Sequence, residues 1–161
     1  MTTTPRNHST FARRRSERGA ALVELAVALP LLLVIMVGTI DFGRAFRTAM
    51  IVTNAARAGA QLGSQNSVNA TNTTGMVAAA NAVLTANGLG ASPAPTASTL
   101  CQCATNSGVF TNAANCSDPC TGGHLVVSVT VTATRTFSLI QPFPGIPSSV
   151  TITRSATARA Q

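Results

Sequence analysis

The longest apolar stretch of the chain lies near its N-terminus. Residues 25–40 (LAVALPLLLVIMVGTI) carry no charge, and residues 20–24 extend the stretch with Glu24 as its only ionisable group. About 20 helical residues span the hydrocarbon core of a bilayer. Pro30 is expected to kink such a helix, a distortion that neighbouring membrane helices tolerate. The pattern therefore predicts one membrane-spanning helix.

The helical pattern continues beyond the apolar stretch. Small and apolar residues recur mostly at steps of three and four, at Phe42, Ala45, Phe46, Ala49, Thr53, Ala56 and Ala60. We expect a single helix over residues 20–62, roughly 65 Å long. Its second half projects from the membrane and packs a small domain against this stripe. Phe42 and Phe46 are expected in that core; the alternative is that they form a partner-binding pair.

A second, shorter helix is predicted over residues 75–87. Residues 63–75 are rich in serine, asparagine and threonine and are expected to form a loop. Thr74 is the expected N-cap of the helix, and Gly88 is the expected left-handed residue at its C-terminal end. Residues 91–98 contain two prolines and are expected to form a connector.

The C-terminal third predicts β-structure. Residues 124–134 and 150–158 alternate between apolar and polar side chains with a period of two. The proline-rich residues 141–147 separate them as a rigid loop. We expect an antiparallel pair with one face on the long helix and the other in water. The predicted fold class is α+β, a long N-terminal transmembrane helix packed by a short second helix and a small antiparallel sheet.

Charge is scarce and unevenly placed. The chain has 11 basic residues, all arginine, and only 9% of its residues are charged, against about 25% in ordinary soluble domains. The four acidic residues and two histidines are too few for most acid–base or multi-carboxylate metal chemistry, so we expect no enzyme activity, no cofactor and no metal. Five of the arginines lie within the first 18 residues, beside the apolar stretch. This terminal cluster favours a topology signal over nucleic-acid binding.

The charge pattern sets the expected organisation of the chain. Residues 1–19 form a basic leader in the cytoplasm, of which residues 1–18 are expected to be disordered. Residues 20–62 form the transmembrane and projecting helix. Residues 63–161 form a small extracytoplasmic α+β domain.

Four cysteines lie beyond the predicted anchor, at Cys101, Cys103, Cys116 and Cys120. An extracytoplasmic compartment favours two disulfides, which help a small domain to hold its shape. Adjacent pairing is strained at the Cys101–Cys103 spacing, which leaves a nested and a crossed pattern. We favour the nested one, Cys101–Cys120 with Cys103–Cys116, because it suits a hairpin that turns near residues 106–108.

A structural zinc site is the rival interpretation of the cysteines, with Asp118 and His124 nearby. A C-x-C pair is a poorer zinc ligand than the usual C-x₂₋₄-C, and an oxidising compartment disfavours thiolates. A catalytic Cys–His pair would need a reduced thiol beside His124. We expect neither.

The N-terminal segment resembles a known family. Residues 18–30 (RGAALVELAVALP) and residues 41–46 (DFGRAF) are similar to the start of TadE-like proteins, pseudopilins of the tight-adherence (Flp) pilus system. The resemblance is strong from Arg18 to about Gln61, and the C-terminal strand, proline-rich turn and final strand are also similar to the family. It implies that a prepilin peptidase cuts after Gly19 and that the mature chain begins at Ala20.

Glu24 is the informative residue of the apolar stretch. A carboxylate inside such a segment is costly and normally marks a partner or a function. Cleavage after Gly19 would create an ammonium group at Ala20, about one helical turn from Glu24, in the same chain or in a neighbour. Ala20 and Glu24 would then set the register between subunits. The alternative is that Glu24 lies near the helix end and reaches the cytoplasmic surface.

The sequence thus predicts a TadE-like minor pseudopilin, a structural subunit in pilus assembly held in the bacterial inner membrane. The implied partners are a prepilin peptidase, other pilins and pseudopilins, the inner-membrane assembly platform and the membrane itself, with energy from a cytoplasmic ATPase. One alternative is an uncleaved single-pass scaffold of a pilus or secretion apparatus. A further alternative is an exported metal-binding or redox domain.

Overall fold

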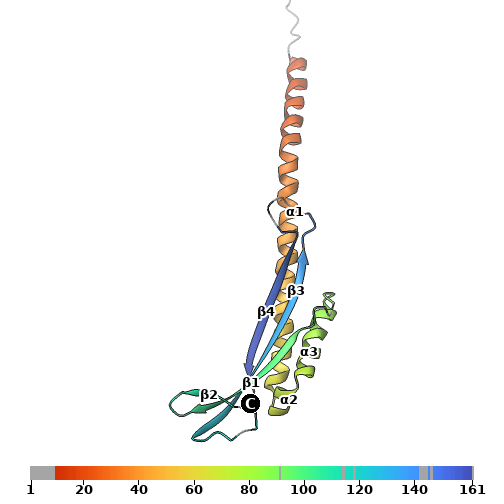
Figure 1. Cartoon of the computed structure of the whole chain (residues 1–161). Helices are drawn as coiled ribbons and strands as arrows, with labels where there is room; N and C mark the ends of the chain where they lie inside the picture. Colours follow the sequence, from red (N-terminus) through yellow and green to blue (C-terminus); the bar gives the residue numbers. More distant parts are fainter. Residues whose placement is uncertain are drawn as a thin grey trace, which may run out of the picture. The chain divides into compact units, whose positions relative to one another are not determined.

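The computed structural model describes residues 10–90, 92–113, 115–117, 119–141, 145 and 147–160, with side chains from residue 19 onward. The chain divides into two units, residues 1–42 and residues 43–161. The described part of the first unit is helical. The second unit holds the C-terminal part of the same helix, two shorter helices and a four-stranded antiparallel sheet (Figure 1). The predicted α+β class is confirmed.

The N-terminal helix α1 (Thr10–Ser64) is longer at both ends than the predicted 20–62. Residues 10–18 are helical although disorder was expected there, because alanine, arginine and glutamate dominate this segment and all are strong helix formers. Pro30 lies inside the helix, as expected.

The core of the second unit forms where α1, α3 (Thr73–Ala86) and β3 (Gly123–Ser138) meet. Most of its buried side chains are small or medium-sized. They are Ile51, Val52, Ala55, Ala56 and Ala60 from α1, Ala70, Met76, Ala80 and Leu84 from the shorter helices, and Val129, Val131 and Ala133 from β3. The predicted burial of Ala56 and Ala60 is thereby confirmed.

Two glycines let the backbones approach closely at this core. A Cβ on Gly59 would lie 2.7 Å from the carbonyl oxygen of Met76 and 3.0 Å from Cγ1 of Val131. A Cβ on Gly63 would meet the sulfur of Met76 and lie 3.0 Å from Cγ2 of Val129. No side chain fits between these elements, so Gly59 and Gly63 set the distance of α1 from α3 and β3.

The prediction that Phe42 and Phe46 belong to the core is wrong. Phe42 is 74% exposed and Phe46 is 58% exposed. The buried stripe includes Val52 and Gly59. Phe46 lies six residues before Val52, which at about 100° per residue places it roughly 120° away around the helix. It therefore remains outside the contact with the sheet.

Asparagine side chains begin both short helices. Asn66 accepts from the Asn69 backbone N–H (2.8 Å) at the start of α2 (Ser67–Thr71), a helix that the sequence did not predict. Asn72 accepts from the Gly75 N–H (2.9 Å) and caps α3, so the prediction of Thr74 as the cap is wrong. The cap therefore lies two residues earlier, and α3 begins at Thr73 rather than at residue 75.

Gly88 ends α3 in the left-handed conformation that its position predicted. Its φ is 75°. Its N–H donates to Thr85 O (3.0 Å), and the N–H of Leu89 donates to Leu84 O (3.0 Å). These two bonds satisfy the last carbonyls of the helix. The Leu89 side chain packs against the core, which fixes the direction in which the chain leaves α3.

The sheet has the strand order β2-β1-β3-β4, with every neighbouring pair antiparallel. β3 and β4 (Ser149–Arg159) confirm the two predicted strands and extend them. β1 (Thr96–Thr105) and β2 (Phe110–Asn112) form the hairpin that was expected around residues 106–108, and the turn contains Gly108 at φ 81°. β1 begins inside the predicted connector because its neighbour β3 supplies ten paired positions.

The two faces of the sheet differ as the alternation predicted. Val129, Val131 and Ala133 point to the helices and are buried. The opposite face carries hydroxyl groups that bond across the strands. Thr130 and Thr157 lie 2.9 Å apart by their hydroxyl oxygens. The hydroxyl oxygens of Thr134 and Thr153 lie 3.1 Å apart.

We expect Gly59→Ala to destabilise the second unit by about 1–3 kcal/mol, because the added methyl group has no space beside Met76. The better helix propensity of alanine, about 1 kcal/mol, offsets only part of this cost. Gly43→Ala is the matched control, since it lies on the same helix with nothing within 4 Å of the added Cβ. Chemical unfolding of the detergent-solubilised chain, followed by circular dichroism, measures both. A Gly59→Ala chain as stable as the control would contradict the close-contact interpretation.

Candidate functional site

Gly19, Ala20 and Glu24 lie on α1 within the first unit, and all three are exposed. Residues four apart in a helix share a face, and helical side chains lean toward the N-terminus. The Glu24 carboxylate therefore covers the turn that starts at Ala20. The helix brings Ala20 and Glu24 to one face, whereas the cleavage and register roles of these residues stay predictions.

The apolar stretch is uncovered within the chain. From Leu22 to Met36 the large side chains are between 47% and 75% exposed, with Leu29 and Val27 at the two limits. The helical segment Gly19–Ser64 has a mean hydropathy of 2.7 over its most apolar window, and none of that window is buried. By length and composition this helix can cross a membrane once. A long apolar helix followed by a disulfide-bonded unit indicates a membrane-anchored protein with an extracytoplasmic domain.

The cysteines form two disulfides, and the pairing is crossed. Cys101 is bonded to Cys116, and Cys103 is bonded to Cys120. The nested pairing that the sequence favoured is therefore not the one in the structure. The hairpin on which that preference rested is present, but Cys116 and Cys120 lie beyond it, after the end of β2.

The path of the chain explains the crossed order. The chain leaves β2 beside Cys101, to whose carbonyl oxygen the Ala113 N–H donates (2.9 Å). It enters β3 at Gly123, which pairs with Thr105 at the far end of β1. The described residues between these two points, 113, 115–117 and 119–122, thus run past β1 in the same direction as β1 itself. A hairpin would have run the opposite way.

This direction fixes which cysteines meet. The segment passes Cys101 first and Cys103 second, so its first cysteine, Cys116, bonds the former and Cys120 bonds the latter. Positions two apart in a strand share a face, so both bonds hold the segment against one side of β1. The side is that of the helices, because Thr99 on the same face donates its hydroxyl to Ala70 O in α2.

His124 lies away from the cysteines. It pairs with Ala104, while Cys101 and Cys103 occupy the alternate positions of β1. Adjacent positions point to opposite faces, so His124 and the disulfides are on different sides of the sheet. The sulfur atoms are joined to one another and are not the thiolates that a zinc site requires. Asp118, the other ligand in that alternative, lies outside the described residues.

Arg135 is a structural centre that the sequence analysis missed. It is only 3% exposed. Its guanidinium donates to Leu89 O (3.2 Å), Gly90 O (2.6 Å) and Pro93 O. Burial lowers the pKa of Arg135 from its ordinary value. The residue thereby ties the connection between α3 and β1 to β3.

A signal for Arg135 was present in the sequence. The period-two pattern of β3 continues past the predicted end at Thr134. It then places Arg135 and Phe137 on the same face as Val131 and Ala133. An arginine at an inward position needs partners, and here the partners are backbone carbonyl groups.

Comparison with known protein families identifies the N-terminal segment. Residues 19–61 match the family model described as TadE-like protein. The match confirms the resemblance that the sequence predicted and contains Gly19, Ala20 and Glu24. It covers most of α1 and leaves residues 62–161 outside. No curated protein and no solved structure matches the chain.

We expect Cys101→Ser/Cys116→Ser to leave no thiol for alkylation, because the Cys103–Cys120 bond remains. Cys101→Ser/Cys120→Ser should expose two thiols, because each remaining cysteine has lost its own partner. Mass spectrometry of chains alkylated without reductant distinguishes the two variants. The reverse labelling pattern would restore the nested pairing. Loss of either disulfide is expected to lower the free energy of unfolding by about 2–4 kcal/mol.

Proposed function

Because residues 19–61 form a TadE-like domain, we propose that this chain is a minor pseudopilin of a tight-adherence (Flp) pilus. In this role it is a structural subunit in pilus assembly and carries out no chemistry of its own. The family match over the apolar helix is the single observation that carries the proposal. The proposed location is the bacterial inner membrane, with the N-terminus in the cytoplasm and residues 63–161 outside.

The exposed apolar side chains of α1 support two successive uses of the same helix. In the membrane they are covered by lipid, which removes their surface from water. In a filament, the helices of neighbouring subunits would cover them instead. A helix with Glu24 as the only ionisable group between Ala20 and Ile40 serves both uses.

Processing after Gly19 would give Glu24 a partner. Cleavage leaves an ammonium group on Ala20, on the helical face that Glu24 covers. The pair would neutralise two charges that are each costly in an apolar environment. Only processed subunits would offer that ammonium group, so the pairing would restrict assembly to them.

The partners follow from the same proposal. A prepilin peptidase would process the chain, the inner-membrane assembly platform would receive it, and other pilins or pseudopilins would pack against its helix. A cytoplasmic ATPase would supply the energy. The second unit, held by its core, its two disulfides and Arg135, would be carried outside the membrane as a folded body.

One observation favours a second candidate, an uncleaved single-pass scaffold of a pilus or secretion apparatus. α1 is helical on both sides of Gly19, from Thr10 onward. A peptide bond inside a helix must be unwound before a peptidase can act on it. The state of the N-terminus in cells therefore separates the two candidates.

We expect the membrane-extracted protein to begin at Ala20 in cells with an active prepilin peptidase. Gly19→Leu should leave the full-length precursor, because a bulky side chain replaces the residue at the cut. Gly38→Leu, at another glycine of the same helix with nothing within 4 Å of an added Cβ, should be processed normally. Intact mass and N-terminal sequencing give the result. Recovery of wild-type chain beginning at Met1 would support the scaffold instead.

We expect Glu24→Leu to insert and be processed like the wild type, because the change removes a charge and lies five residues after Gly19. Its recovery with other pilus components should fall at least tenfold, which corresponds to about 1.4 kcal/mol. Glu17→Gln, in the part removed by cleavage, is the matched control and should assemble normally. Membrane abundance, N-terminal processing and co-purification are measured on the same samples. Normal assembly of Glu24→Leu would mean that Glu24 only reaches to the membrane surface.

A further inference from the structure

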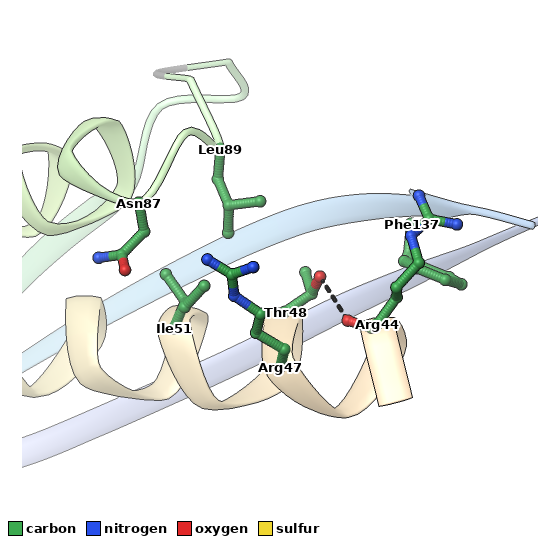
Figure 2. Close-up of a pocket in the computed structure, with 7 residues that line it drawn as sticks. All are labelled: Arg44, Arg47, Thr48, Ile51, Asn87, Leu89 and Phe137. Carbon is green, nitrogen blue, oxygen red and sulfur yellow. Dashed lines mark hydrogen bonds between the residues drawn. The ribbon is translucent and has the colours of Figure 1, made fainter. Parts of the chain in front are cut away.

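A small cavity with two arginines lies in the second unit, between α1, the turn after α3 and the end of β3. Its volume is about 190 Å³, and its lining includes Arg44, Arg47, Asn87, Leu89 and Phe137 (Figure 2). We propose that it binds the phosphate group of an anionic phospholipid headgroup. This proposal rests on the membrane anchoring in the proposed function and adds a ligand site to it.

The two guanidinium groups make the cavity a site for an anion. Arg44 lies over the ring of Phe137, 5.2 Å from its centroid, which holds one cation in place. Arg47 is exposed and has no hydrogen bond or ion pair with any described residue. Figure 2 shows its guanidinium turned toward the side where Leu89 lies. No acidic residue of the described chain lines the cavity. Guanidinium groups bind phosphate oxygens in pairs of parallel hydrogen bonds.

The chain itself offers few anions for this site. Residues 43–161 contain six arginines and a single acidic residue, Asp118. The earlier part of the mature chain adds only Glu24, inside the apolar stretch, and Asp41, which is 3% exposed, and a second copy would bring the same three acidic side chains. The excess of cations therefore favours an anion from outside the protein.

The rest of the lining favours an amphipathic anion over a free one. Ile51, Leu89 and Phe137 present apolar surface beside the arginines. Inorganic phosphate would leave this surface unused. A phospholipid places its phosphate next to a glycerol backbone and the start of the acyl chains, which such surface can cover.

The position of the arginines in the sequence selects a membrane lipid. They follow Ile40, the last residue of the apolar stretch, by four and seven residues, about 6 Å and about 10 Å along the helix. The headgroup layer is roughly 5–7 Å thick. Helical side chains generally lean toward the N-terminus. Figure 2 shows the Arg44 side chain extended in that direction, toward the layer that contains the phosphates, whereas the Arg47 guanidinium turns toward Leu89.

The test titrates the chain in a neutral detergent with dihexanoyl phosphatidylglycerol, dihexanoyl phosphatidylcholine or inorganic phosphate, and measures binding by calorimetry. We expect saturable binding of the phosphatidylglycerol and at least tenfold weaker binding of the other two. Arg47→Gln should weaken phosphatidylglycerol binding about tenfold, the size of one charge-assisted interaction. Arg44→Gln should act in the same direction.

Arg57→Gln is the matched control, because it removes the same charge from an exposed position of the same helix outside the cavity. It should change the affinity less than twofold. If Arg57→Gln weakened phosphatidylglycerol binding as much as Arg47→Gln does, the effect would come from general surface charge, and the proposed site would be overturned. Equal affinity for inorganic phosphate or for phosphatidylcholine would overturn the anionic lipid as ligand, as would an absence of saturable binding. Processing at Gly19 and pilus co-purification are measured separately, so either proposal can fail without the other.

Discussion

The second unit depends on how closely α3 and β3 approach α1. The chain has no tryptophan or tyrosine, and its fully buried side chains are no larger than Met76 and Leu84. Such a core gains contacts only if the backbones come near one another, because dispersion forces fall steeply with distance. Gly59 and Gly63 permit that approach. The small residues therefore allow a chain with few large apolar side chains to form a packed interior.

The parts of the unit that lie beyond this core are held by other bonds. At one end of β3 the disulfides attach Cys116 and Cys120, in the segment between β2 and β3, to β1. Further along the same strand Arg135 binds the carbonyl groups of the connection between α3 and β1. Neither device needs a large apolar side chain. The lack of large apolar side chains makes the core small. It also explains why disulfides and the hydrogen bonds of Arg135 hold the parts outside the core.

The sequence predicted secondary structure correctly where a hydrophobic pattern was long and uninterrupted. The apolar stretch predicted α1, and the alternation in residues 124–134 predicted β3 and the face that it buries. β1 was missed because its serines, threonines and cysteines lack a regular apolar alternation, and its strand state depends on pairing with β3. The crossed disulfides were missed because their order depends on the direction in which a loop passes β1. Phe46 was misplaced because the helical face that packs is decided by the partner elements. Of the candidate site, residues 19–24 are a prediction from the motif alone, while recognising Arg135 required the true end of β3.

The second unit carries two kinds of surface, the threonine-rich face of the sheet and the arginine-bearing surface of α1. Thr130 with Thr157 and Thr134 with Thr153 satisfy one another across the strands, and the groups involved do not ionise near neutral pH. Attraction between these threonines and another surface is therefore insensitive to salt and acidity. The arginine-bearing surface of α1 behaves oppositely, since screening shortens its reach to about 8 Å at physiological ionic strength. A change of ionic medium would thus alter the contacts made by the arginines of α1 and leave those made by these threonines unchanged.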